Sequence, residues 1–218
     1  MPKKKKINWE RAFKLVALCH STEGNIDYYI KWFGYDKYMF VEDQLTDTEL
    51  HCFADGKEIV IIAQGSDSFT DWFWNIAAIG KVKTSFGKVH SGFYLAVKRL
   101  LEKKDFMDFI ESNEGAIYLA GFSKGGAIVT VMAPYLFRVK EIYTFGSPRV
   151  GDWNYAKNYP MINILFAFKN SNDLIPHLPP IWFWYKHIDS ENFEFKKGRH
   201  GAGEYYRTVS ETFYETRK

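Results

Sequence analysis

Residues 117–127 of the chain read Ile-Tyr-Leu-Ala-Gly-Phe-Ser-Lys-Gly-Gly-Ala. An apolar run of strand length leads directly into Gly-x-Ser-x-Gly, with Ser123 at its centre, and then into a helix-forming sequence. A serine on a tight strand-to-helix turn needs small neighbours, which Gly121 and Gly125 supply. The N–H groups at the start of the following helix would face a developing negative charge. This context predicts a nucleophile elbow, rather than an ordinary glycine-rich turn, with Ser123 as the nucleophile.

The segments around this turn alternate between strand-like and helix-like patterns. Strand-like apolar runs occupy residues 116–120, 141–145 and 163–168. Helical spacing of apolar residues extends over 90–109 and 123–136. Buried strands that alternate with helices form a sheet that is mostly parallel in its centre.

The N-terminal part has a different pattern. A first helix is expected to start at Asn8, a favourable capping residue, and to end near Gly24. Short strand-like runs follow at 39–41, 49–53 and 58–63. The Asp55-Gly56 pair between the last two is a hairpin signal. We therefore expect one α/β domain over residues 1–218, in which antiparallel N-terminal strands precede a mostly parallel central sheet flanked by helices.

Composition restricts the class of partner. The chain has 218 residues and a formal net charge of +3, which comes largely from the four lysines Lys3 to Lys6. The remainder is close to neutral, so a nucleic-acid partner is not expected. A short charged run at a terminus is usually solvated, and residues 1–7 are expected to form a disordered basic tail.

Cysteine content and hydropathy bear on metal sites and location. Cys19 and Cys52 are the only cysteines, and no closely spaced Cys/His pattern surrounds them, so neither a disulfide framework nor a metal site is expected. No apolar stretch approaches the ~20 residues that span a bilayer. The lysine-rich start is not followed by an apolar signal core. These features predict a cytoplasmic protein without a transmembrane segment.

A serine nucleophile needs a base and an acid that orients the base. In α/β-hydrolases the acid follows the serine along the chain and the histidine comes last. Asp173 lies in the loop after the strand-like run 163–168, where such folds assemble their sites. Asp152 is the competing carboxylate and is expected to cap a helix. Three histidines follow Asp173: His177, His187 and His200. His177 is too close to fold back onto the acid, and the other two remain open on this reasoning.

Five motifs stand in a fixed order along the chain: Gln64-Gly65-Ser66, Val89 to Tyr94, Gly121 to Ala127, Tyr143 to Gly151, and Asn172 to Pro180. In this order they resemble the class 3 (fungal-type) lipases of the α/β-hydrolase superfamily, over roughly residues 10–210. The stretches Phe-Gly-Ser-Pro-Arg-Val-Gly and Asp-Leu-Ile-Pro-His-Leu-Pro-Pro carry the resemblance most specifically.

The resemblance implies a role for each residue that matches the family's motifs. It implies Ser123 as nucleophile, Asp173 as acid, and His200 as base, because His200 lies in a loop before a final helix as the family's catalytic histidine does. His187 resembles a non-catalytic segment of the family. The backbone N–H groups of Ser66 and Lys124 would form the oxyanion hole.

The sequence departs from the family at three positions near these motifs. Gln64 stands where the family usually has arginine, and Phe122 and Lys124 flank Ser123 where it usually has histidine and leucine. These changes concern substrate range rather than the reaction, because the oxyanion donor at Lys124 is main chain. The Lys124 stem is expected to carry its charge to solvent; attraction of anionic head groups is the alternative.

An aromatic segment follows Ser66. One face of a short helix would gather Phe69, Trp72, Phe73 and Ile76, with Trp74 to its side. The family places the start of a lid here, so these residues are expected to contact substrate and to cover the site. The alternative is that this face packs permanently in the core.

Together these features predict a serine hydrolase that cleaves carboxylic esters of lipids, as a triacylglycerol lipase or acyl-ester hydrolase does, without a metal or cofactor. Phospholipase and short-chain carboxylesterase activity are alternatives. A hydrolase-like domain that binds lipid or protein without turnover is a further one, and a peptidase or thioesterase is the weakest. The expected partners are the ester substrate and, transiently, a lipid interface.

Overall fold

The computed structural model describes residues 5–22, 24–65 and 80–217 of the chain. Its centre is a seven-stranded sheet in the order β1-β2-β3-β6-β7-β8-β9. The strands are β1 (Lys37–Asp43), β2 (Thr48–Ala54), β3 (Glu58–Ala63), β6 (Ala116–Phe122), β7 (Val139–Phe145), β8 (Leu165–Asn170) and β9 (Glu191–Phe195). β1, β2 and β3 pair antiparallel, and from β3 to β9 the pairing is parallel. The expected mostly parallel sheet with antiparallel N-terminal strands is confirmed.

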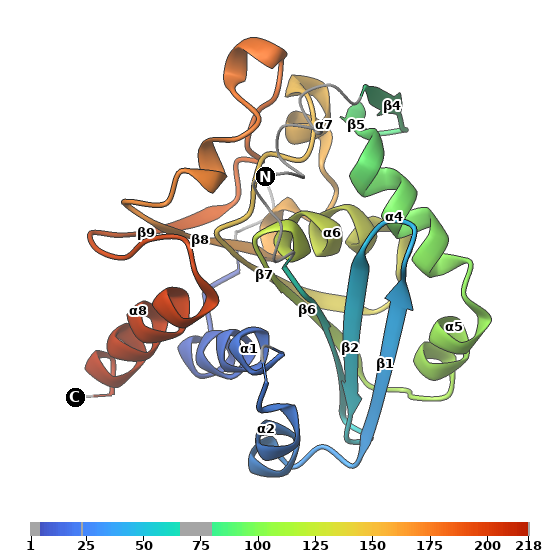
Figure 1. Cartoon of the computed structure of the whole chain (residues 1–218), viewed down its shortest axis with the longest axis vertical. Helices are drawn as coiled ribbons and strands as arrows, with labels where there is room; N and C mark the ends of the chain where they lie inside the picture. The colour runs from blue at the N-terminus through green and yellow to red at the C-terminus, as the bar shows by residue number, and fades with distance from the viewer. Residues whose placement is uncertain (1–4, 23, 66–79, 218) are drawn as a thin grey trace.

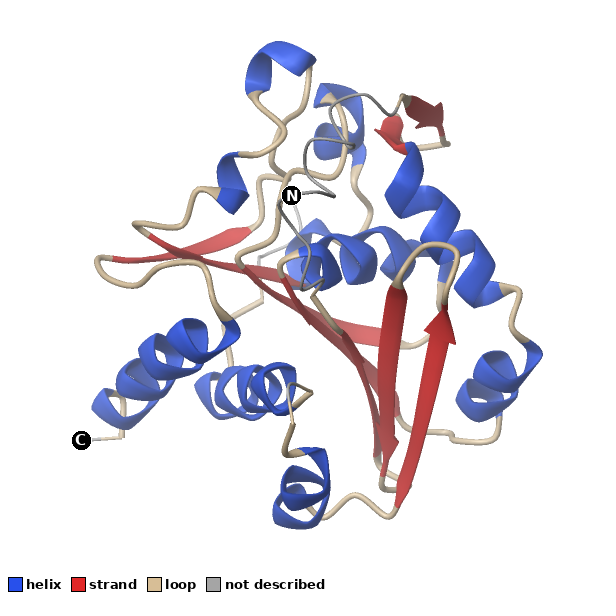
Figure 2. Cartoon of the chain, viewed as in Figure 1, coloured by secondary structure: helices blue, strands red, loops and turns tan. Residues whose placement is uncertain are grey.

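Helices cover both faces of this sheet (Figures 1 and 2). One face carries α1 (Trp9–Ser21), α2 (Ile26–Phe33) and α8 (Ala202–Glu215). The other carries α4 (Ser91–Leu101), α5 (Lys104–Glu111) and α6 (Lys124–Met132). A short helix, α7 (Trp153–Asn158), and a two-stranded sheet of β4 (Lys81–Lys83) and β5 (Lys88–His90) complete this part of the fold.

The alternation of side chains along β6 explains the two covered faces. Ile117 and Leu119 point into the core beneath α4 and α6, whereas Tyr118 and Ala120 point into the core beneath α1 and α8. All four side chains are buried. A central parallel strand therefore needs apolar residues at every position, which is the pattern of 116–120.

Three helix boundaries refine the expectations from the sequence. Asn8 caps α1 as expected, because its Oδ1 accepts a hydrogen bond from the N–H of Arg11 at 3.0 Å. The single helix expected over 90–109 is two helices, α4 and α5, with Lys103 in an extended conformation between them. The helix expected to reach residue 136 ends as α-helix at Met132, and a 3-10 turn follows because Pro134 has no N–H to donate.

Residues 5–7 of the expected basic tail contact the domain. The Lys5 N–H donates to the carbonyl of Asn163 at 3.1 Å, and its ammonium lies 2.5 Å from a carboxylate oxygen of Glu141. Ile7 packs against the core beneath α1. Residues 1–4 lie outside the described residues. Within the described part of the chain, every helix is too short or too polar to cross a lipid bilayer.

Candidate active site

The turn between β6 and α6 holds Ser123 in a conformation that few non-glycine residues adopt. Its φ is +54° and its ψ is −124°, and its N–H donates to the carbonyl of Phe145 at 2.8 Å. A Cβ on Gly121 would lie within 3.0 Å of the backbone of Gly125, and one on Gly125 within 3.0 Å of the backbone of Ala63. Only glycine fits at both positions, so the packing of β3, β6 and α6 fixes this strained turn.

Ser123, His200 and Asp173 lie in one hydrogen-bonded row. The Nε2 of His200 is 2.9 Å from the Ser123 Oγ, and its Nδ1 is 2.8 Å from the Asp173 Oδ2. Asp173 follows the carboxyl end of β8, and His200 lies in the loop that precedes α8. Ser123 and Asp173 are buried at 1% exposure each, whereas the His200 side chain is 26% exposed. The structure thus brings together three of the residues singled out in the sequence, with the imidazole between hydroxyl and carboxylate.

Three donors hold the Asp173 carboxylate. Besides His200, the Tyr205 hydroxyl donates to Oδ2 at 2.6 Å and the Ile175 N–H donates to Oδ1 at 2.8 Å. The Tyr205 oxygen in turn accepts from the N–H of Asn170 at 3.0 Å. Burial, reinforced by Asp173, raises the pKa of Tyr205, which keeps this hydroxyl protonated as a donor.

Tyr205 was not expected from the sequence. The available signal was its position five residues after His200, in the first turns of the expected final helix.

Phe122 was singled out only as a departure from the family. Its ring stacks on the His200 ring, with centroids 4.7 Å apart and an interplanar angle of 29°. It therefore restrains the imidazole from the side.

The competing residues have other partners. The His187 Nε2 donates to the carbonyl of Pro176. His177 is exposed, and the imidazole of His90 caps the start of α4 by accepting from the N–H of Gly92 at 3.1 Å. Asp152 caps α7, where it accepts from the N–H of Tyr155 at 2.8 Å, as expected.

Burial gives His187 a predictable effect on stability. It lowers the pKa of His187 to about 3, with Lys169 contributing, whereas an unfolded histidine has a pKa near ~6.5. Between these values the unfolded chain binds the extra proton, so stability is lost as pH falls below about 6.5. Urea unfolding at about pH 7.5 and about pH 5 should show roughly 1–2 kcal/mol of acid destabilisation that His187→Gln removes. The exposed His177→Gln serves as the control and should keep most of the wild-type loss, because His177 makes the smallest contribution to the lowered pKa of His187. An identical loss in His187→Gln would contradict the assignment.

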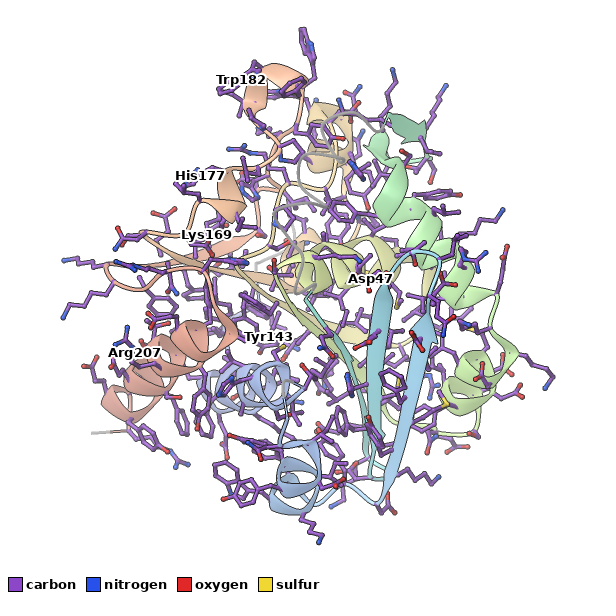
Figure 3. All side chains as sticks on the ribbon, viewed as in Figure 1. Asp47, Tyr143, Lys169, His177, Trp182 and Arg207 are labelled. Atoms are coloured by element: carbon purple, nitrogen blue, oxygen red, sulfur yellow. The ribbon has the colours of Figure 1, made fainter. Side chains whose placement is uncertain are left out.

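Lys124 is the first residue of α6, and its side chain does not reach solvent. The residue is 2% exposed, and its ammonium donates to the carbonyls of Thr46, at 2.9 Å, and Asp47 in the β1–β2 turn. The Asp47 carboxylate lies 3.7 Å away, and Figure 3 labels this residue at the turn. Burial lowers the pKa of Lys124, and Asp47 opposes that shift. The expectation of a solvated ammonium is wrong, because the turn carbonyls replace water around the charge.

Six sequence-based assignments lie outside the described residues. They are the oxyanion residue Ser66 and the lid residues Phe69, Trp72, Phe73, Trp74 and Ile76. Their roles stay predictions. Of the expected oxyanion pair, Lys124 is described, and its N–H stands at the N-terminus of α6.

A family model described as Lipase (class 3) matches residues 60–183, which is more than half of the chain and includes most of β3, the elbow and Asp173. The chain belongs to the class 3 lipase family. Its resemblance to that family is therefore confirmed. Similar curated proteins include a lipase of Rhizomucor miehei, 30% identical over 149 residues, and the secreted mono- and diacylglycerol lipase 1 of Fusarium solani, 29% identical over 153 residues.

Each of these two matches covers 62% of this chain, but 41% and 43% of the respective relative, so the class 3 lipase chain spans less than half of their length. Among solved structures, lipase II from Rhizopus niveus superposes with a TM-score of 0.74 at 20% identity, covering 88% of this chain and 82% of that one. This likeness confirms the α/β-hydrolase fold. The expected cytoplasmic location is contradicted, because relatives from Fusarium solani and Penicillium cyclopium are named as secreted.

Proposed function

We propose that this class 3 lipase homologue is a serine hydrolase that cleaves carboxylic ester bonds of lipids. The observation that carries the proposal is the row Ser123 Oγ, His200 imidazole and Asp173 carboxylate, with separations of 2.9 and 2.8 Å. These are hydrogen-bond distances between a nucleophile, a base and the group that orients the base. The family membership supports the same chemistry.

The first half-reaction forms an acyl-enzyme. The His200 Nε2 accepts the Ser123 hydroxyl proton while Oγ bonds to the ester carbonyl carbon, whose oxygen becomes negatively charged. The Lys124 N–H at the start of α6 would stabilise that oxyanion, with the Ser66 N–H as the second donor that the family resemblance implies. The imidazolium then protonates the leaving alcohol as the carbon–oxygen bond breaks.

Water completes the cycle. His200 removes a proton from a water molecule as it attacks the acyl carbon, and it returns the proton to Ser123 when the acyl group leaves as a carboxylic acid. Asp173 accepts from the Nδ1–H of His200 throughout and stabilises the imidazolium. Because Tyr205 and the Ile175 N–H also donate to Asp173, its carboxylate stays fixed in the orientation that selects this tautomer.

The substrate class is inferred from the relatives. Two of the similar proteins are named as mono- and diacylglycerol lipases, which favours acylglycerols over phospholipids as the ester of this chain. The same names favour action outside the cell. Comparing initial rates on emulsified diacylglycerol, triacylglycerol and phospholipid vesicles would rank these substrates.

Labelling by a fluorophosphonate tests the proposal directly. An activated serine beside an oxyanion hole reacts with phosphorus electrophiles, whereas ordinary serines do not. We expect stoichiometric labelling that Ser123→Ala abolishes and that Ser171→Ala, a change at an exposed serine before Asp173, leaves intact. Folded protein that takes up no label would instead be a binding domain without turnover.

A further inference from the structure

The chain forms a projecting loop soon after the candidate acid. From Asp173 it passes through a 3-10 turn at Ile175–His177 and a second at Ile181–Phe183. Figure 3 shows Trp182 at the outer end of this loop, beyond His177. The four residues Ile181, Trp182, Phe183 and Trp184 are here called the aromatic loop.

The aromatic loop exposes an unusual amount of apolar surface. Its side chains are 59%, 75%, 45% and 75% exposed in sequence order. Single exposed apolar residues are common, but four consecutive large ones on a projection mark an interaction site. A folded protein keeps such a large apolar surface exposed when a binding partner covers it during function.

Defined contacts hold the loop in its exposed position. The Arg149 guanidinium donates to the carbonyls of His177 and, at 2.7 Å, Pro179. The Lys81 ammonium donates to the carbonyl of Phe183 at 2.7 Å. These contacts tie both sides of the loop to the body of the protein, so its shape is built into the fold.

The backbone of Trp184 gives an independent indication. Its φ is +61°, in the left-handed region that glycine adopts without strain and other residues adopt at a cost of roughly 1–2 kcal/mol. The chain nevertheless has a tryptophan there, and the indole is 75% exposed. Neither core packing nor backbone geometry accounts for this residue, so its side chain is suited to a partner outside the protein.

The charges near the loop favour a lipid surface as that partner. Between Asp173 and Asp189 the chain has no Asp or Glu, and the nearby Asp152 carboxylate is held by the N–H of Tyr155 at the start of α7. The Lys81 ammonium lies 4.2 Å from the ring centroid of Tyr185, and that of Lys186 lies 4.5 Å from the ring centroid of Trp153, which is itself 52% exposed. Tyrosine and tryptophan rings beside ammonium groups match the boundary between acyl chains and anionic headgroups.

We propose that the aromatic loop is the anchor by which this protein binds a lipid surface, with Trp182 and Trp184 entering the interface and Lys81 and Lys186 facing anionic headgroups. The inference rests on the proposed function in that a lipid hydrolase must reach an aggregated substrate. Leu174, next to Asp173, is also 74% exposed, so an exposed apolar side chain lies beside the candidate triad as well. Anchoring would therefore bring the ester close to Ser123.

Vesicle sedimentation tests the anchor independently of turnover. Every protein would carry Ser123→Ala, and the vesicles would be phosphatidylcholine alone or mixed with phosphatidylglycerol. We expect Trp182→Ser/Trp184→Ser to weaken binding to both by about ten-fold or more, since binding strength follows the apolar area inserted. Lys186→Ala, which keeps the Lys81 contact with the Phe183 carbonyl, should weaken binding only to the mixed vesicles.

Phe137→Ser is the matched control. Phe137 is 88% exposed and precedes β7, at the edge of the sheet opposite Asp173, so its loss should leave vesicle binding unchanged. Unchanged binding by the double tryptophan variant would overturn the proposal. A concentration-dependent dimer that forms without lipid and is lost in that variant would also overturn it, because a second copy would then cover the loop.

Activity on a monomeric ester separates this proposal from the proposed function. With Ser123 restored, the double tryptophan variant should hydrolyse a dissolved short-chain ester at the wild-type rate. An equal loss on that ester would place these residues in the substrate site and overturn the anchor. Failure of the proposed function would appear differently, as wild-type protein that binds vesicles but hydrolyses no ester.

Discussion

Replacement of Ser123 by alanine is expected to lower kcat for ester hydrolysis by about 10⁴–10⁶-fold while the protein stays folded. The substitution removes the hydroxyl oxygen that lies 2.9 Å from the His200 Nε2 and should leave the surrounding packing unchanged. Without it no acyl-enzyme forms, and only weak assistance to direct attack by water remains. Burst and steady-state kinetics on a p-nitrophenyl ester measure this loss, and thermal unfolding checks the fold.

Ser147→Ala is a suitable control for that measurement. Ser147 packs beside Gly126 in α6, and its hydroxyl donates to the carbonyl of Pro148 at 3.2 Å. Its loss should keep kcat within about ten-fold of wild type. Residual Ser123→Ala activity above about a hundredth of wild type would mean that another group is the nucleophile.

His200→Ala is expected to cause a loss of similar size, about 10⁴–10⁶-fold in kcat, whereas His187→Ala should not. Only the first removes the imidazole that contacts both Ser123 and Asp173. The His187 imidazole donates to the carbonyl of Pro176, so its removal should affect stability rather than the chemical step.

Combining the nucleophile and base substitutions, Ser123→Ala and His200→Ala, sharpens this prediction. Because nucleophile and base act as one unit, Ser123→Ala/His200→Ala should be no less active than either single variant. Steady-state kinetics on one soluble ester compares the wild type, the two single variants and the double variant under the same conditions. A His187→Ala variant that is inactive beside an active His200→Ala variant would reverse the assignment.

Local patterns were sufficient to predict the centre of the fold and part of the candidate site. The strand at 116–120, the glycines around Ser123 and the helix after them are neighbours in sequence, so their geometry follows from residue type and spacing. Asp173 could be placed because the loop after a parallel strand opens at the carboxyl edge of the sheet. Family membership, likewise, followed from five ordered motifs.

Contacts between distant segments could not be predicted in the same way. His200 and His187 both follow Asp173, and only the folding of the intervening loop decides which imidazole reaches the carboxylate. The partners of Lys124 lie 77 and 78 residues earlier in the chain. Burial of the lysine depends on those turn carbonyls, which no periodicity in the sequence reveals.

Lys124 connects the β1–β2 turn to the candidate active site, although the two are far apart in the sequence. The backbone N–H of this residue lies at the candidate oxyanion hole, while its ammonium donates hydrogen bonds to the carbonyls of Thr46 and Asp47. Asp47 is on the surface, with a side chain that is 74% exposed. A single side chain thus links this solvent-exposed hairpin to the place where the negative charge of the oxyanion would develop. Substitutions in that hairpin should therefore be treated in protein engineering as changes that can alter catalysis, and not as neutral surface substitutions.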